Sequence, residues 1–290
     1  MIEVIIDTLL DTLKLLPFLY LTYLLMEFLE HRSAGAAEGL LKRSGQVGPL
    51  LGSALGILPQ CGFSAAATGL YTGRIITTGT LIAVFLSTSD EMLPVLISEG
   101  APVVFIVKIL AAKLLIGTVA GFAVDFIISL INKKRKVSAQ PQIEELCERE
   151  GCRCGSNFAL SALTHTLRIT VFILIFSFAL NTAIHFVGED TISSIVLERH
   201  LLGNIVAAMI GIIPNCASSI ILTELHLGGV ISVGSMLSGL LVNAGVAVAL
   251  LFRNNRPIKD SFKIVGILLL VGILSGFLID ISPLAKFFAL

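Results

Sequence analysis

Long apolar runs recur along the chain, and short polar turns separate them. Each run has enough residues to cross the ~30 Å hydrocarbon core of a bilayer as a helix. The pattern therefore predicts an all-α, polytopic membrane protein. The eight predicted segments are 12–30, 47–71, 75–98, 101–131, 158–187, 200–226, 228–252 and 262–288.

Composition narrows the class further. Of the 290 residues, 55% are hydrophobic and 14% are charged, whereas an ordinary globular domain has about 25% charged residues. This depletion, with a mean hydropathy of +0.95, excludes a disordered chain and argues against a soluble enzyme. The 20 basic and 20 acidic residues balance, so no general attraction to nucleic acid is expected. The expected partner surface is a lipid bilayer.

A single hydrophilic linker, 132–157, divides the chain into transmembrane parts 1–131 and 158–290, and these two parts are related in sequence. A shift of 155 positions lays Gly56–Gly73 on Gly211–Gly228 with eight identical residues. The identities include Pro59 with Pro214 and Cys61 with Cys216, while Gln60 faces Asn215. Leu and Ile matches arise easily by chance between apolar segments, but a Pro-[Gln/Asn]-Cys match in register with glycines does not. We infer a duplicated module, as in many secondary transporters.

Positive charges predict the topology, because Lys and Arg favour the cytoplasmic loops. If 47–71 and 200–226 are re-entrant hairpins, which enter and leave on one side, fourteen of the 20 Lys and Arg residues become cytoplasmic. We therefore expect two inverted repeats in the cytoplasmic (inner) cell membrane, each with three full transmembrane helices and one Pro-broken re-entrant helical hairpin. A Pro-broken helix that spans fully is the alternative.

The hairpin tips are the first candidate site. Each half-helix of about 11 residues is about 16 Å long and reaches the midplane. Broken backbone is tolerated there only where protein or water covers it, and proline frees helical carbonyls. We predict that Gln60, Cys61, Asn215 and Cys216 bind a desolvated substrate, with the two thiols as soft metal ligands. The alternative is that the cysteines only fill space and the prolines only kink helices.

A second polar interruption, at 87–91, lies inside segment 75–98, and its counterpart surrounds Asn243. Ser87, Thr88 and Asn243 are candidate substrate-binding residues in these two interruptions.

Ionisable residues near the same depth are candidates for ion coupling, because such groups are costly inside a membrane. They are Asp90 and Glu91, with Lys113, expected near the middle of segment 101–131, as their charge partner. The alternative is that one of the carboxylates ends its helix at the outer interface.

The linker offers a third candidate site, in which Cys147, Cys152 and Cys154 stand among glutamates. Cytoplasmic thiols stay reduced and are available as metal ligands. The spacing differs from the paired CxxC of structural zinc sites. A plain solvated linker is the alternative.

Catalytic motifs are missing from the sequence. It contains no GxxxxGK[ST], no Ser/His/Asp elbow and no HExxH, so we predict neither an enzyme nor a cofactor. Ion-gradient coupling or a partner ATPase would then drive transport. The sequence does not fix the oligomeric state, and a homo-oligomer is compatible with it.

Over essentially its whole length the sequence resembles a family of ten-transmembrane heavy-metal exporters, labelled arsenic efflux proteins or manganese transporters. The resemblance lies in GILPQCGFSAAATGLYTGRI from Gly56, FLSTSDEMLPVL from Phe85, GIIPNCASSIILTEL from Gly211, and Cys152-Arg153-Cys154. The family linker often reads Cys-His-Cys, so Arg153 weakens a linker metal site here. Ten segments agree with counting each hairpin as two half-helices.

The resemblance and the residues together predict a secondary transporter that exports a heavy-metal or metalloid ion. The cysteines favour an arsenite-like solute, whereas the carboxylates and amides favour Mn²⁺. Two alternatives stay open: an organic-solute permease of the same architecture, and a membrane metal sensor or accessory subunit that works through the linker cysteines.

Overall fold

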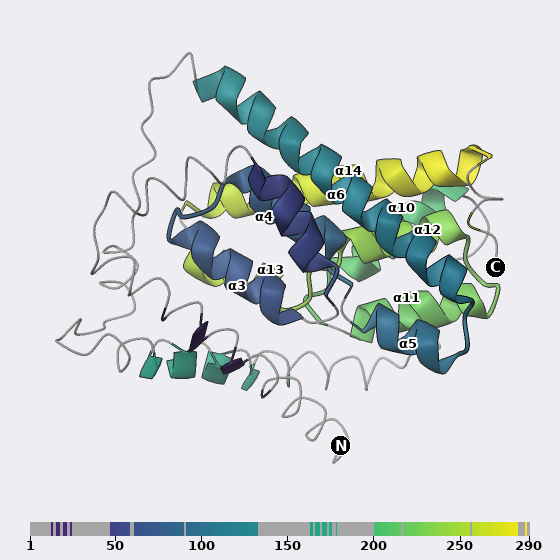
Figure 1. The fold of residues 1–290 in the computed structure, drawn as a ribbon, viewed down its shortest axis with the longest axis horizontal. Coiled ribbons are helices and arrows are strands. Elements are labelled where there is room, and N and C mark those ends of the chain that lie inside the picture. Colours follow the sequence, from purple (N-terminus) through teal and green to yellow (C-terminus); the bar gives the residue numbers. More distant parts are fainter. Residues whose placement is uncertain are drawn as a thin grey trace.

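The structure is a computed structural model that describes residues 47–58, 61–89, 91–132, 200–215, 217–255, 257–283 and 288, with isolated positions in 13–24 and 163–178. These residues form helices joined by turns and short loops, and they contain no strand (Figure 1). After the helix Val47–Gly56, the first half contains α3 (Cys61–Thr72), α4 (Thr78–Ser87), α5 (Met92–Ser98) and α6 (Val103–Asn132). The second half contains α10 (His200–Gly211), α11 (Ala217–Leu227), α12 (Val233–Val242), α13 (Ala247–Asn254) and α14 (Ile258–Ile281).

Four helical stretches in the described residues are long and apolar enough to cross a membrane. Large apolar side chains are exposed along two of them, such as Val104 and Phe126 on α6 and Leu274 on α14. In water such a surface would be unusual, whereas lipid tails cover it without cost. The prediction of an all-helical, polytopic membrane protein is thereby supported. The four stretches are Thr78–Ser98, Val103–Ile131, Val233–Asn254 and Ile258–Ile281.

Proline accounts for the first interruption in each half. Val47–Gly56 ends three residues before Pro59, and α10 ends three residues before Pro214. A proline inside a helix donates no hydrogen bond and clashes with the carbonyl four residues earlier, so neither helix continues. We name the connection 57–60 tip 1 and the connection 212–216 tip 2.

The predicted second interruption is present in both halves. Between α4 and α5 lies break 1, residues 88–91, and between α12 and α13 lies break 2, residues 243–246. Pro94 in the first turn of α5 is compatible with a helix start but not with one continuous helix through residue 90. In break 2, Gly245 has a left-handed φ of 55°, which a glycine adopts without strain.

The same helix packing occurs in both halves. α4 packs on α6 and α12 packs on α14. A Cβ atom added to Gly79 would lie 2.2 Å from the carbonyl oxygen of Gly121, and one added to Gly234 would lie 2.3 Å from that of Gly276. Both pairs are related by the shift of 155 positions. The backbones of these helices therefore approach so closely that only glycine fits.

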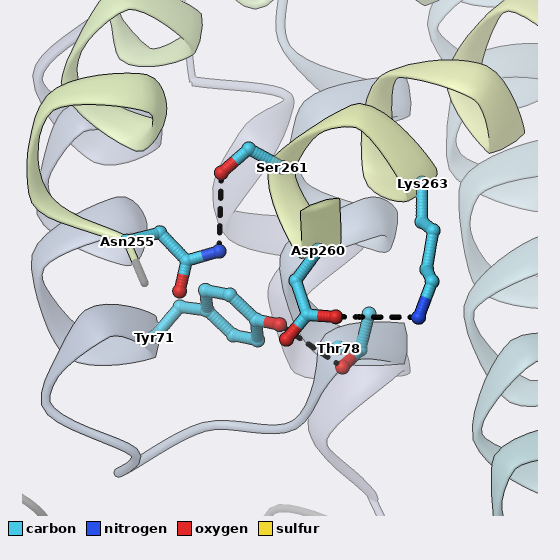
Figure 2. A network of polar contacts seen from close by, with 6 residues as sticks. All are labelled: Tyr71, Thr78, Asn255, Asp260, Ser261 and Lys263. Carbon is cyan, nitrogen blue, oxygen red and sulfur yellow. Dashed lines mark hydrogen bonds and ion pairs between the residues drawn. The ribbon is translucent and has the colours of Figure 1, made fainter. Parts of the chain in front are cut away.

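One end of the molecule, which we call the Tyr71 end, gathers the end of α3, the start of α4, the end of α13 and the start of α14 (Figure 2). The Tyr71 hydroxyl lies 3.4 Å from the Thr78 hydroxyl, and the Asn255 amide donates to the Ser261 hydroxyl at 3.1 Å. Arg74, just after α3, has a left-handed φ of 59°, and its guanidinium lies 5.6 Å from the centre of the Tyr71 ring.

The opposite end, which we call the His226 end, joins the end of α11 to the starts of α6 and α12. The rings of His226 and Phe105 stack with centres 5.7 Å apart, and His226 Nδ1 lies 3.0 Å from the carbonyl oxygen of Ile231. Thus α4 begins at the Tyr71 end and its counterpart α12 begins at the His226 end. Likewise α6 begins at the His226 end and its counterpart α14 begins at the Tyr71 end.

Both predicted boundaries of the last segment are wrong. Segment 262–288 was expected from its apolar residues, but α14 begins at Ile258 and ends at Ile281. Its first turn is polar and follows Pro257, which suits a helix start, and Pro283 stops it soon after Ile281. The other predicted segments that the structure describes are helical where they were expected, apart from their interruptions. Segments 12–30 and 158–187 lie outside the described residues, apart from isolated positions.

Candidate functional site

The helix that follows tip 1 is bound to break 2. The Ser64 hydroxyl donates to the carbonyl oxygen of Ala244 at 3.3 Å, and the Thr68 hydroxyl lies 3.5 Å from the carbonyl oxygen of Ala247. Both hydroxyl-bearing side chains are buried. These contacts join parts of the chain that are 180 and 179 residues apart.

Tip 1 also contacts break 1, because the Ser89 hydroxyl donates to the carbonyl oxygen of Ile57. The helix that follows tip 2, α11, packs on α5, the short helix after break 1 in the first half. Each half thus places the helix after its tip against the short helix after the other half's break (Figure 1). α3 lies on α13 on one side of the middle of the molecule, and α11 lies on α5 on the other.

Two predicted site residues are buried asparagines in the interruptions of the second half. In tip 2, Asn215 Oδ1 accepts from the backbone N–H of Ala217 at 3.2 Å, at the start of α11. In break 2, Asn243 is 2% exposed and its Oδ1 accepts from Gly245 N–H at 2.9 Å. Its Nδ2 is buried and has no hydrogen-bond partner among the described residues. Because buried donors are normally paired, this amide is a candidate for contact with a bound solute.

Ser87 and Thr88 are buried, but their hydroxyls turn back to their own helix. Ser87 Oγ donates to the carbonyl oxygen of Ala83 at 2.8 Å, and Thr88 Oγ1 donates to that of Val84 at 2.8 Å. Ser and Thr commonly satisfy carbonyls three or four residues earlier in this way. The backbone carbonyl of Thr88, in contrast, accepts from a residue of another helix, Lys113.

Lys113 is the largest polar side chain that is fully buried in the described part of the chain. Its Nζ donates to the carbonyl oxygen of Thr88 and, at 2.7 Å, to that of Leu240. Thr88 begins break 1, and Leu240 lies in the last turn of α12. The lysine therefore joins break 1 of the first half to the end of α12 in the second half.

The structure does not describe every predicted site residue. Gln60, Asp90, Cys216 and the three linker cysteines Cys147, Cys152 and Cys154 lie outside the described residues, and Cys61 is described only as the first residue of α3. Glu91 is partly buried before α5 and makes no side-chain capping bond there. Among the described residues no group of three or more His, Cys, Asp or Glu side chains is arranged to hold a metal ion.

Sequence reasoning missed two capping carboxylates. Asp125 on α6 accepts from Gly79 N–H at 2.8 Å and from the Thr77 hydroxyl at 2.6 Å, at the start of α4. Asp280 on α14 accepts from Gly234 N–H at 3.0 Å and from the Ser232 hydroxyl at 2.8 Å, at the start of α12.

A signal for this pair was present in the sequence. Extending the repeat to the end of α6 aligns Gly117-x3-Gly121-Phe122-x2-Asp125 with Gly272-x3-Gly276-Phe277-x2-Asp280. The repeat therefore continues well beyond the tips, into residues that hold the helices together.

Broken helices that recur in the two halves and meet inside an apolar bundle indicate a polytopic membrane protein. A family model described as "Putative, 10TM heavy-metal exporter" matches residues 1–182 and 159–288. Because these ranges together cover nearly the whole chain, the protein belongs to this family. Membership of a family of exporters implies transport rather than catalysis. No curated protein and no solved structure matches the chain.

Proposed function

We propose that this protein is a secondary transporter that exports a heavy-metal or metalloid species through a midplane site between two opposed hairpins. The bond from Ser64 to Ala244 is the observation that supports this site most directly, because it brings the helix after tip 1 to break 2. Together with the Ile57–Ser89 bond and the packing of α11 on α5, it gathers interrupted backbone from both halves. Such backbone inside a membrane lines a cavity or is covered by protein.

The proposed architecture is a pair of inverted repeats. It is supported by equivalent helices that begin at opposite ends of the molecule, α4 against α12 and α6 against α14. With such repeats, one hairpin enters from each side of the membrane and the two tips approach each other near the midplane.

The distribution of Lys and Arg residues supports the proposed orientation of the protein in the membrane. Four of the described basic residues lie at or near the Tyr71 end: Arg74 beside the Tyr71 ring, Arg253 in the last turn of α13, and Lys259 and Lys263 in the first two turns of α14. The loops 99–102 and 228–232 at the His226 end contain Glu99 and no Lys or Arg. By the positive-inside rule, the Tyr71 end is cytoplasmic, and we propose the inner cell membrane as the location.

The proposed substrate site contains the tip residues Gln60, Cys61, Asn215 and Cys216, with Ser87, Thr88 and Asn243 of the breaks. Thiol ligands favour an arsenite-like solute, and amide and carbonyl oxygens favour Mn²⁺. We further propose that Asp90 and Glu91 carry a coupling ion. The unpartnered Nδ2 of Asn243 supports a solute contact at break 2.

A metal panel tests the proposal. The full chain is expressed in cells that lack their own exporters, and tolerance and cell content are measured for arsenite, antimonite, Mn²⁺, Zn²⁺ and Cd²⁺. We expect higher tolerance and lower content for at least one of them. Unchanged tolerance and content for all five would contradict metal export.

Paired cysteine variants identify the kind of substrate. For a thiophilic solute, Cys61→Ser and Cys216→Ser should each lower export at least tenfold, whereas export of Mn²⁺ should change little. Cys147→Ser separates a contribution of the linker thiols from that of the tip thiols. Transport by an organic-solute permease would be unchanged in both tip variants. A metal sensor would lose its function when 140–155 is deleted, whereas a transporter would keep its flux.

A further inference from the structure

The carboxyl-terminal ends of two broken helices meet at Lys113. The last carbonyls of a helix have no partner within it and carry a partial negative charge. The lysine Nζ donates to one such carbonyl from each helix, that of Thr88 after α4 and that of Leu240 in the last turn of α12. One ammonium group therefore serves two helix ends from different halves of the protein.

Neighbouring carbonyls at these ends are satisfied locally. In α4, the carbonyls of Ala83 and Val84 accept from the hydroxyls of Ser87 and Thr88. In α12, the carbonyl of Gly239 accepts from the backbone N–H of Asn243 at 3.0 Å. Lys113 thus supplies the hydrogen-bond donor for the carbonyls of Thr88 and Leu240.

The duplication shows that helix packing alone does not require a lysine here. The residue equivalent to Lys113 in the second half is Leu268, which is 0% exposed and belongs to the apolar core. A leucine therefore fills the same position on α14 without a polar group. The lysine is specific to the first half, where its side chain lies between break 1 and the end of α12.

Where discontinuous membrane helices meet in transporters, half-helix carboxyl ends commonly coordinate a free Na⁺ or other cation. We propose that the ammonium of Lys113 is a built-in cation that fills such a coordination site between break 1 and α12. This assignment rests on the transporter architecture proposed above. Because this cation is covalently attached, the junction binds no free alkali cation, and transport needs neither Na⁺ nor K⁺ at this place.

Thermal unfolding of the purified full chain in nanodiscs tests the assignment without measuring transport, so its failure is distinguishable from failure of metal export. Unfolding is compared at constant ionic strength in Na⁺, K⁺, ammonium or N-methyl-D-glucamine, the last of which is too large for the site. The variants are Lys113→Ala, which vacates the site, and Lys113→Met, which removes the charge but keeps the volume. Lys108→Ala removes a lysine from the same helix away from the junction.

We expect the unfolding temperature of the wild type, of Lys113→Met and of Lys108→Ala to be independent of the salt, although Lys113→Met should unfold at a lower temperature than the wild type because it also lacks the donor. Lys113→Ala should unfold about 5–10 °C lower in N-methyl-D-glucamine, since two carbonyls lose their donor. A small cation at tenfold its Kd should then raise its unfolding temperature by about 3 °C.

Equal temperatures for Lys113→Ala in all salts, or an equal rise in all four proteins, would overturn the assignment. If Lys113→Ala does not fold in N-methyl-D-glucamine, we expect it to fold when purified in a small cation, and failure in every cation counts against the proposal. A wild type that is stabilised by Na⁺ over N-methyl-D-glucamine would contradict it independently of any variant.

Discussion

Asp125 and Asp280 are equivalent residues 155 positions apart, and each caps the amino terminus of a helix in its own half with the same two hydrogen bonds. Each accepts from a glycine N–H and from a Thr or Ser hydroxyl that itself caps the helix. In a membrane these N–H groups have no water to bind, and a carboxylate suits the positive end of a helix. The duplication therefore extends from sequence to individual hydrogen bonds.

The first prediction concerns this pair. Asp125→Asn and Asp280→Asn each keep an oxygen for the glycine N–H but lose the acceptor for the hydroxyl. Asp280→Asn also loses the oxygen that accepts from the Asn204 amide at 3.2 Å. Each should lower the free energy of unfolding by about 1–3 kcal/mol, and the two effects should be nearly additive because the sites share no partner. Chemical unfolding in detergent measures both variants and the double variant.

Asp260→Asn is the control, because Asp260 pairs with the exposed Lys263 at 3.4 Å. An exposed pair contributes at most about 1 kcal/mol. An effect of Asp125→Asn or Asp280→Asn no larger than that of this control would contradict a capping role.

A second prediction concerns the close approach of helices in each half. Gly79→Ala and Gly234→Ala place a Cβ atom 2.2 Å and 2.3 Å from a backbone carbonyl, so the helices must separate. We expect each to destabilise the protein by at least about 1–3 kcal/mol. Gly266→Ala on α14 meets nothing within 4 Å and should be neutral or stabilising by up to about 1 kcal/mol. Unfolding temperatures of the three variants decide whether the packing is as close as described.

The interruptions of the helices could be predicted from sequence because their causes are local. Pro59 and Pro214 end helices wherever the chain places them, and the polar run at 87–91 does not suit an apolar helix interior. Their long-range partners could not be predicted in the same way. The bond from Ser64 to Ala244 depends on how the two halves dock, which no local pattern specifies.

Side-chain direction limited the site prediction in a similar manner. Ser87 and Thr88 are predicted as site residues because they lie in a polar interruption, but at a helix end their hydroxyls reach carbonyls of the preceding turn. The polar character of Lys113 was visible in the sequence, whereas the carbonyls of Thr88 and Leu240 to which it donates are backbone atoms with no sequence signature.

The third prediction tests the buried amide of break 2. Asn243→Ala removes the unpartnered Nδ2 and the bond to Gly245, and it should reduce export about tenfold or more if the amide contacts the solute. Asn255→Ala is a matched control, since it also removes one buried amide and one hydrogen bond, but at the Tyr71 end. Both should lose about 1 kcal/mol of stability. Equal export by the two variants in the metal assay would remove Asn243 from the proposed site.

The most direct test of the inverted, opposed-hairpin arrangement is the side from which equivalent loops are labelled. Single cysteines are placed at Arg74 and Lys259, and at Glu99 and Val230, in a chain whose five cysteines are replaced by serine. Arg74 and Val230 lie in equivalent turns of the two halves, 74 being equivalent to 229. A membrane-impermeant maleimide is applied to intact and to permeabilised cells.

We predict that positions 99 and 230 react in intact cells and that positions 74 and 259 react only after permeabilisation. Reaction of positions 74 and 230 from the same side would mean that the two halves have the same orientation, and would contradict the proposed transporter architecture.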